Sequence, residues 1–274
     1  MGARTISLRA VVLSLACLMF VGFVARAQAE QGSAVVKALR GRVSSMDALG
    51  FTRLLKLGDV LKPGETVTTG PDSTVDLFLD QIGRGLELAP NSMLSLEKMT
   101  RETSAIGTVT DTRVELQKGG VYGVVLGLRP GSQFEVKTPQ GLTSVKSGTS
   151  EFFIDALQGT VYVTLGTVQL HLVLNLAGGP LTRDVTINAG PSGPGLFISI
   201  PPHLTESEFS TLSPAPLTMK NNRTQLLRLA GLGTLTRYRD TSTDLRGVAE
   251  TFNATESGTT LTITKPPTSS VVSP

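Results

Sequence analysis

Short runs of alternating apolar residues, separated by tight-turn residues, constrain this chain more than any other feature. They are densest between residues 55 and 79. Alternation with a period of two places one face of a strand against a core and the other in water. Pro63-Gly64 and Gly70-Pro71 supply backbone angles that strands do not adopt. The stretch therefore predicts three or four very short strands, with these alternating apolar residues: Leu55, Leu57, Val60, Leu61, Val67, Val75, Leu77 and Leu79.

The same pattern recurs along most of the chain and predicts an all-β domain. The composition agrees, because 29 Gly and 15 Pro favour a turn-rich β protein. Many short strands at a spacing of roughly 8 to 12 residues are typical of a sandwich, a barrel, or a β-roll or solenoid-like fold. No exact repeat period stands out, so a strict solenoid is not indicated and the arrangement of the strands remains open. Six apolar residues are expected to face the core: Val75, Leu77, Phe134, Val136, Val161 and Val163.

Several local features are predicted from turn and breaker residues. A first pair of strands is expected around a turn near Gly41, and the polar run 100–113 is expected to form a loop. Turns are expected at Gln158-Gly159 and again at Gly166-Thr167. Residues 204–218 have the composition of a linker.

The N-terminus has the three-part layout of a secretory signal. A positively charged start precedes an apolar run at 10–25, and Ala27-Gln28-Ala29 is a small-x-small cleavage site. The run is shorter than the roughly 20 residues that a spanning helix needs, although an uncleaved anchor remains the alternative. Lipidation at Cys17 is disfavoured, because the apolar run continues past it. We therefore expect cleavage before Glu30, a periplasmic or secreted location, and a mature chain without cysteine or disulfide.

The chain is expected to comprise a leader, one main domain and a C-terminal extension. The extension contains little helix, apart from one short segment capped at Asn222 or Thr224. Its end is dominated by Thr, Ser and Pro, which is typical of disorder. The predicted units are the signal peptide 1–29, the β domain 30–202, the extension 203–255 and the disordered tail 256–274.

Charge excludes one class of partner. The chain has 25 Lys and Arg against 22 Asp and Glu, and three of those bases precede Glu30. The mature chain is therefore close to neutral and has no basic run. A nucleic-acid partner is not expected, because such proteins carry a basic patch that neutralises phosphates.

No motif predicts catalysis or metal binding. The two histidines are His171, placed on the wetted face of a strand by its neighbours, and His203. With no mature cysteine they do not form a zinc set. Ser95-Leu96-Glu97-Lys98 and Lys146-Ser147-Gly148 are similar to the S-x-x-K and K-T-G elements of penicillin-recognising enzymes. Ser95 lies in an alternating strand rather than at a helix start, and no S-D-N element lies between them. We expect a protein that is not an enzyme, with no catalytic, metal or cofactor residues.

An ordered series of short fragments between Val35 and Ile200 resembles the periplasmic domain of FecR-family proteins. The fragments are Gly41-Arg42-Val43, Leu57-Gly58-Asp59-Val60-Leu61, Pro63 to Gly70, Ser73 to Leu77, Leu116 with Lys118-Gly119-Gly120-Val121, Phe134 to Pro139, Gly148-Thr149, Phe153, Val161-Tyr162-Val163 and Val185 to Gly190.

This resemblance implies a β-rich envelope domain without catalytic residues. The chain departs from the family at 146–149, where an Arg-Gly-Thr is usual, and at 80–85, where a shorter hairpin is usual. Only nine residues precede the apolar run, so we expect the cytoplasmic anti-sigma segment of the family to be absent, which puts control of a sigma factor in doubt.

Three functions follow as hypotheses. The first is an exported, non-catalytic envelope module that binds a protein or a surface polymer through strand edges and loops. The second is a transmembrane-signalling regulator of the FecR type, which requires membrane contact through an uncleaved N-terminal segment. The third is a structural envelope protein that assembles into a homo-oligomer.

Overall fold

The computed structural model describes residues 29–79, 84–104, 107–146, 148–176, 179–190, 195–201, 203–217, 234–239 and 248–253. Regular structure in these segments is almost entirely strand, which confirms the all-β prediction. Residues 1–28 of the predicted signal peptide 1–29, the predicted short helix near Asn222 and the predicted tail at 256–274 lie outside the described residues.

Short strands follow one another along the described chain, with one helical turn near the end of the main domain. The elements are β1 (Glu30–Gln31), β2 (Ala34–Arg40), β3 (Val43–Met46), β4 (Thr52–Leu54), β5 (Val60–Leu61), β6 (Thr66–Thr69), β7 (Thr74–Leu79), β8 (Arg84–Leu88), β9 (Met93–Ser104), β10 (Gly107–Lys118), β11 (Gly120–Leu128), β12 (Gln133–Thr138), β13 (Gly141–Val145), β14 (Gly148–Asp155), β15 (Thr160–Leu176), β16 (Gly179–Ala189), β17 (Leu196–Ser199), α2 (Glu206–Thr211), β18 (Ala215–Pro216), β19 (Thr234–Arg239) and β20 (Val248–Asn253).

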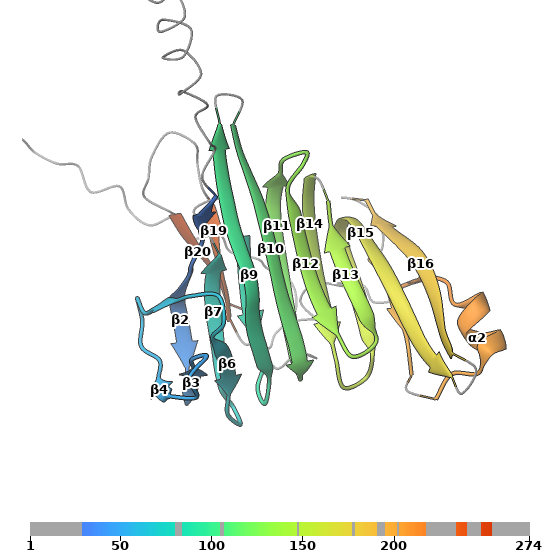
Figure 1. Ribbon diagram of the computed structural model, residues 1–274, viewed down its shortest axis with the longest axis horizontal. Helices are drawn as coiled ribbons and strands as arrows, with labels where there is room; N and C mark the ends of the chain where they lie inside the picture. Colours follow the sequence, from blue (N-terminus) through green and yellow to red (C-terminus); the bar gives the residue numbers. More distant parts are fainter. Residues whose placement is uncertain are drawn as a thin grey trace, which may run out of the picture.

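The strands of the main domain form two stacked sheets that share β15 (Figure 1). Sheet A has the order β4-β3-β6-β9-β10-β12-β13-β15-β16, with β1 also pairing to β9. Sheet B has the order β5-β2-β7-β8-β11-β14-β15-β17-β18. Strands β19 and β20 pair separately. The predicted three short strands within 55–79 are β5, β6 and β7.

The chain passes repeatedly from one sheet to the other, and this corrects the predicted strand pair around Gly41. Strand β2 pairs with β5 and β7 in sheet B, whereas β3 pairs with β4 and β6 in sheet A. Gly41, with φ of 73°, is therefore a corner between layers and not a hairpin turn. Alternation of apolar residues is the same at a corner and at a hairpin, so the sequence did not distinguish them.

Strand β15 corrects a second prediction, because the chain does not turn at Gly166. Residues Thr160 to Val163 pair with β17 in sheet B, and Gly166 to Leu176 pair with β16 in sheet A. Gly166 has φ of 82°, and a β-carbon there would come within 2.0 Å of the Thr149 carbonyl oxygen. This glycine therefore lets one long strand bend across both layers.

A buried serine supports the turn at three places. In Pro71-Asp72-Ser73, Pro90-Asn91-Ser92 and Pro130-Gly131-Ser132 the middle residue has positive φ, at 53°, 56° and 86°. The serine Oγ then accepts a backbone N–H from a neighbouring corner or strand. The donors are Arg42 N–H (2.9 Å), Gly120 N–H (2.9 Å) and Thr110 N–H (3.1 Å), respectively. These bonds satisfy backbone groups that the corners remove from the sheets.

One hydrophobic core fills the space between the two sheets. All six predicted core residues are buried, with Val75, Val136 and Val163 fully so. The rings of Phe134 in sheet A and Phe152 in sheet B lie 6.2 Å apart between their centroids. Two stacked sheets with a shared core form a sandwich. Because the chain passes back and forth between the two sheets, its path resembles that of a β-roll.

The predicted loop at 100–113 is wrong. Its described residues, 100–104 and 107–113, belong to strands β9 and β10, which form an antiparallel ribbon with Met99 opposite Thr112. Thr110 and Thr112 are buried. The low hydrophobicity of this run predicted a loop. Threonine, however, is β-branched and favours strands, so a polar run rich in threonine can form a ribbon.

The predicted linker at 204–218 also contains regular structure. Thr205 caps α2 in a reciprocal capping box with Glu208. Phe209 is buried, and its carbonyl oxygen accepts from Arg183 Nη1 at 2.6 Å. Strand β18 then pairs with β17. The β domain therefore continues beyond residue 202, because a single buried aromatic and a cap anchor a segment that composition marks as a linker.

Candidate functional site

Large apolar side chains are exposed together at one end of the molecule. We call Met46, Leu49, Phe51, Leu54, Leu57 and Val60 the apolar tip; they belong to β3, β4, β5 and the turns between them. Leu49 is 83% exposed and Phe51 72%. Only two other large apolar residues in the described segments are comparably exposed, Val109 and Leu157. A clustered exposed apolar surface is typical of an interaction site, whereas scattered residues are not.

The turn between β3 and β4 holds the most exposed of these side chains outward. Asp47 Oδ1 accepts the backbone N–H groups of Leu49 and Phe51, each at 2.9 Å. Gly50 has φ of 87°, which few other residues adopt. The aspartate fixes this turn through its own neighbouring backbone, as Asx turns do. The exposed position of Leu49 and Phe51 is therefore built into the local structure.

Strand β4 leaves one edge of sheet A unpaired in the described part of the chain. Its only strand partner there is β3. Leu55 N–H donates to Val43 O, and Asp47 N–H donates to Phe51 O. Antiparallel pairs alternate, so the backbone groups of Thr52 and Leu54 point away from β3. Such an edge accepts an added strand through main-chain hydrogen bonds.

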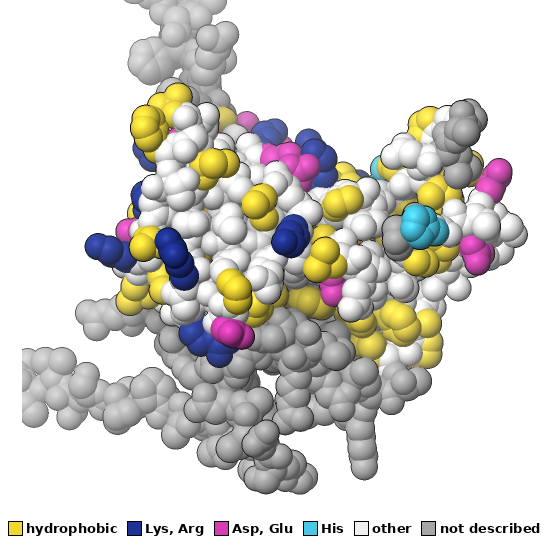
Figure 2. All heavy atoms as spheres, turned by 90° about the horizontal axis from the view of Figure 1, so that it is seen from below, with side chains coloured by type: hydrophobic (Ala, Val, Ile, Leu, Met, Phe, Trp, Pro, Cys, Tyr) yellow, Lys and Arg dark blue, Asp and Glu magenta, His cyan; other side chains and the backbone are white. Residues whose placement is uncertain are grey.

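A polar rim with balanced charge adjoins the apolar tip. Arg53 pairs with Asp59 at 2.8 Å and with Glu65 at 3.3 Å. Asp59 also accepts the Lys56 backbone N–H. Residues 46–65 carry three acids and three bases, so the segment has no net charge. In Figure 2, hydrophobic and basic side chains are interspersed on the left of the lower face, the side on which Figure 1 places β3 and β4.

The apolar tip was not recognised from sequence, and two of its members were predicted to alternate into the core. Leu55 and Leu61 are buried as expected, but Leu57 is 70% exposed and Val60 51%. Strand β5 has only two residues, so alternation gives no reliable direction there.

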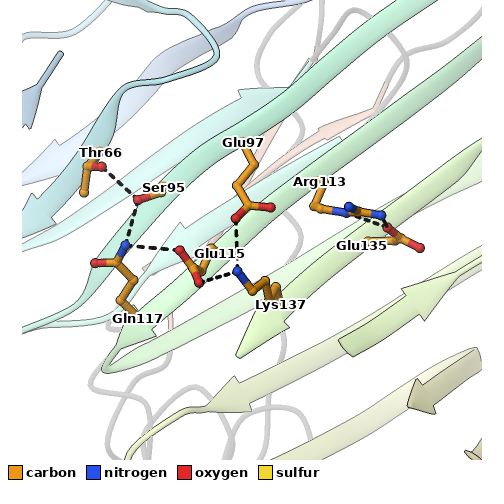
Figure 3. Close-up of polar contacts among 8 residues, drawn as sticks. All are labelled: Thr66, Ser95, Glu97, Arg113, Glu115, Gln117, Glu135 and Lys137. Atoms are coloured by element: carbon orange, nitrogen blue, oxygen red, sulfur yellow. Dashed lines mark hydrogen bonds and ion pairs between the residues drawn. The ribbon is translucent and has the colours of Figure 1, made fainter. Parts of the chain in front are cut away.

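The outer face of sheet A carries a polar ladder across four strands (Figure 3). Ser95 Oγ lies 2.8 Å from Thr66 Oγ1 and accepts from Gln117 Nε2 at 3.1 Å. Lys137 Nζ pairs with Glu115 at 2.8 Å and with Glu97 at 3.4 Å. Cross-strand pairs of this kind stabilise a sheet modestly and keep its face wetted.

Opposite charges in the ladder shift each other's titration in the expected directions. The hydrogen bond from Lys137 lowers the pKa of Glu115, and that carboxylate raises the pKa of Lys137. Glu135 accepts from Arg113 Nε at 2.8 Å and Nη2 at 2.6 Å, which raises the pKa of Arg113. All these shifts favour the charged forms, as in a structural ion-pair network.

The residues of the enzyme-like motifs are not brought together as a nucleophile and base. Lys98 Nζ pairs with Asp111 at 2.5 Å, and Ser95 bonds only neutral side chains among its recorded contacts. Lys146 directly follows the last residue of β13, and Ser147 lies outside the described residues. His171 is exposed, as predicted, and pairs with Asp184 at 2.7 Å across β15 and β16. His203 is exposed. No cluster of potential metal ligands occurs among the described residues.

The outer face of sheet B has a different chemistry. Six side chains occupy one register row across adjacent strands, and we call them the outer row: Asp76, Glu87, Tyr122, Phe153, Tyr162 and Phe197. Ring centroids are 6.0 Å apart for Phe153 and Tyr162, and 5.7 Å for Tyr162 and Phe197. Tyr122 donates from its hydroxyl to Glu151. Sequence reasoning missed this row because it depends on which strands pair.

Two carboxyl groups of the outer row face each other in a buried position. Asp76 and Glu87 are directly opposite in register and are 9% and 4% exposed. Glu87 Oε2 has no hydrogen-bond partner within the described structure. Burial raises the pKa of Asp76 to about 7. Burial, together with the nearby Asp76 and against the opposing effect of Arg40, raises the pKa of Glu87 to about 9. The pair therefore holds at least one proton at neutral pH.

Comparison of the chain with protein-family models, curated proteins and solved structures found no match. Among the described residues, no helix has the length and apolar character needed to cross a membrane.

Proposed function

We propose that this protein is an exported, non-catalytic envelope module that binds a protein partner through the apolar tip and the free edge of β4. The observation that carries the proposal is the concentration of exposed large apolar side chains within residues 46–60. The resemblance of the fragments to a FecR-type periplasmic domain supports a location in the envelope.

The chemistry of the apolar tip favours a protein over a lipid surface. Phe51, Leu49 and Leu54 supply the large apolar contacts that dominate protein interfaces, and Arg53 with its acid partners forms a polar rim. Membrane-surface segments instead combine apolar residues with an excess of bases. Residues 46–65 have no such excess.

The mode of binding follows from the two features together. Backbone groups of Thr52 and Leu54 are free to pair with an incoming strand, which supplies affinity without special side chains. Flanking apolar side chains then supply selectivity. An all-β module can act in this way without any catalytic constellation.

Affinity purification from envelope extracts tests the proposal. The wild-type protein should retain one distinct protein, and a Leu49→Ser/Phe51→Ser variant should lose it. A Leu157→Ser variant is the matched control, because Leu157 is exposed and apolar but lies outside the apolar tip. Retention that is equal in all three proteins, or retention of nothing, would refute the proposal.

The same experiment separates the two alternatives. Co-purification of a sigma factor or inner-membrane complex would support a signalling regulator. Large assemblies of this chain alone, measured by light scattering, would support a structural envelope protein. Loss of binding in the Leu49→Ser/Phe51→Ser variant is required for any partner attributed to the apolar tip.

A further inference from the structure

One of the four edges of the two main sheets is much longer than the others. Strand β4 at one edge has three residues, and β5 and β18 have two each. Strand β16 has eleven residues and pairs with β15 along its whole length without a register shift. In the described part of the chain β15 is its only strand partner, and Figure 1 shows β16 at the end of the sheet. Natural β proteins keep free edges short or blocked, because a long edge readily pairs with another strand.

The register shows which backbone groups of β16 are free. Val173 N–H donates to Gln140 O, on the β13 side of β15, at 3.2 Å. Backbone groups of successive strand residues point to opposite neighbours, so Leu170 points towards β16, where it lies opposite Val185. Along β16, the residues that alternate with Val185 therefore direct their N–H and C=O groups away from β15. In the second half of the strand these residues are Asp184, Thr186 and Asn188.

The first half of this edge is blocked, whereas the second half is open. Pro180 has no N–H to donate. Arg183 donates from Nη1 to the Phe209 carbonyl oxygen of α2 at 2.6 Å, which holds the helix beside this part of the strand. A proline and a charged residue are both devices that protect an edge. From Asp184 to Asn188, by contrast, the three residues with outward backbone groups are exposed.

We propose that β16 pairs with β16 of a second copy of this protein, in an antiparallel two-fold arrangement centred on Thr186. Sheet A then continues from one protomer into the other. The inference does not depend on the protein partner proposed for the apolar tip.

The outer face of the open half is complementary to itself in this register. Thr186 lies opposite Thr186 of the second copy, and Asp184 lies opposite Asn188 of the second copy. Facing threonines are a favourable cross-strand pair, and no like charges meet. Asp184 Oδ1 is occupied by His171, so Oδ2 accepts from the amide of Asn188. The outward backbone groups of both strands add about six main-chain hydrogen bonds.

The inner face of the same segment is apolar. Val185 and Ile187 are 7% and 0% exposed, and they lie opposite each other across the two-fold axis. Side chains that already belong to the core of each protomer therefore meet at the junction, and the apolar core continues across it. A partner strand with charges at these positions would bury them unpaired.

The lengths of the edges favour this closed dimer over a chain of molecules. A head-to-tail contact between β16 and the three residues of β4 would leave much of β16 unpaired, and it would generate an open filament. Pairing of β16 with itself closes after two copies. Because β4 and β16 lie at opposite ends of sheet A, the dimer carries its two apolar tips at its far ends and can bind two partner molecules at once.

Light scattering of the full-length protein with single substitutions at position 186 tests the proposal. The wild type should have the mass of a dimer. Thr186→Pro removes an N–H that β15 does not use, so it should halve the mass while circular dichroism remains unchanged. Thr186→Val keeps both the N–H and the β-branched shape and should remain a dimer. A monomeric wild type, a folded dimeric Thr186→Pro protein, or a mass that grows continuously with concentration would overturn the proposal.

Disulfide cross-linking keeps the test decisive if Thr186→Pro does not fold. In a Cys17→Ser background, Thr186→Cys faces its own counterpart and should form one covalent dimer under mild oxidation. Thr182→Cys is the matched control, because it lies on the same exposed row of β16 but roughly 25 Å from its counterpart in this register. No cross-link at position 186, or equal cross-linking at both positions, would overturn the pairing.

Discussion

Ser92 and Gly119 lie so close together that a β-carbon on Gly119 would come within 2.2 Å of Ser92 Oγ and 2.6 Å of Ser92 Cα. Gly41 and Ser73 repeat this relationship, with 2.4 Å between the added carbon and Ser73 Oγ. Each pair joins a corner between the layers to a turn in which a serine accepts backbone hydrogen bonds. These corners are what allow the chain to alternate between two sheets.

Replacing Gly119 by alanine should therefore lower stability strongly. The substitution combines a φ of 81° with a clash against backbone, so we expect a loss of about 2–4 kcal/mol in the free energy of unfolding. Gly50→Ala is the matched control, because Gly50 has φ of 87° but open space around it, and it should lose only about 1 kcal/mol. Urea denaturation measures both; equal losses would contradict the packing argument.

The register of β15 gives a second prediction. Val163 is fully buried, so Val163→Asp should lower the free energy of unfolding by several kcal/mol, on the order of 3–5, because it buries an unpaired charge. Val109→Asp, at a 37% exposed position in β10, should change it by less than about 0.5 kcal/mol. A soluble Val163→Asp protein with unchanged thermal unfolding would disprove the inward direction of this side chain.

The Asp76–Glu87 pair predicts an unusual dependence of stability on pH. The folded-state pKa values are raised from 3.8 to about 7 and from 4.5 to about 9, so between the lower and upper values the folded protein holds more protons than the unfolded one. The contribution of the pair to stability is therefore complete below pH 4 and declines as pH rises toward 9. Asp76→Asn/Glu87→Gln should flatten this decline in urea titrations at pH 5, 7 and 9. Glu97→Gln, on the outer face of sheet A, should leave it in place.

The enzyme-like motif around Ser95 is predicted not to act as a nucleophile. Lys98 is paired with Asp111, and the contacts that the described residues make with Ser95 Oγ come from Thr66 and Gln117, neither of which is a base. We expect no covalent labelling of the protein by a fluorescent β-lactam in denaturing gels. Labelling that disappears in Ser95→Ala would establish a nucleophile at this position and would contradict a non-catalytic module.

Much of the fold was predictable from local pattern, because residues such as Val161 and Val163 alternate without interruption and face a single core. Pairing partners were not predictable. Gly41 and Gly166 both follow a run of alternating apolar residues. Gly41 lies at a corner between the two sheets, whereas Gly166 lies at a bend within the single strand β15. The three Pro-x-Ser turns at 71–73, 90–92 and 130–132 are a visible repeat, but their meaning depends on donors far along the chain.

Less of the candidate site than of the fold could be predicted from the sequence. Leu57 and Val60 have the same apolar character as buried neighbours, and only the path of the chain shows that they are exposed. Asp76 and Glu87 lie on different strands and become a pair only through the register of β7 and β8. Both features arise from tertiary structure acting on ordinary residues.

Site-specific photo-crosslinking in intact cells tests the central claim, binding of a protein partner at the apolar tip, most directly. A benzophenone side chain in place of Phe51 should form one discrete adduct with a different protein, because that side chain is exposed beside the free edge of β4. The same group in place of Leu157 should form no such adduct. Absence of an adduct at position 51, an identical adduct at both positions, or an adduct only with a second copy of this chain would contradict the proposed partner.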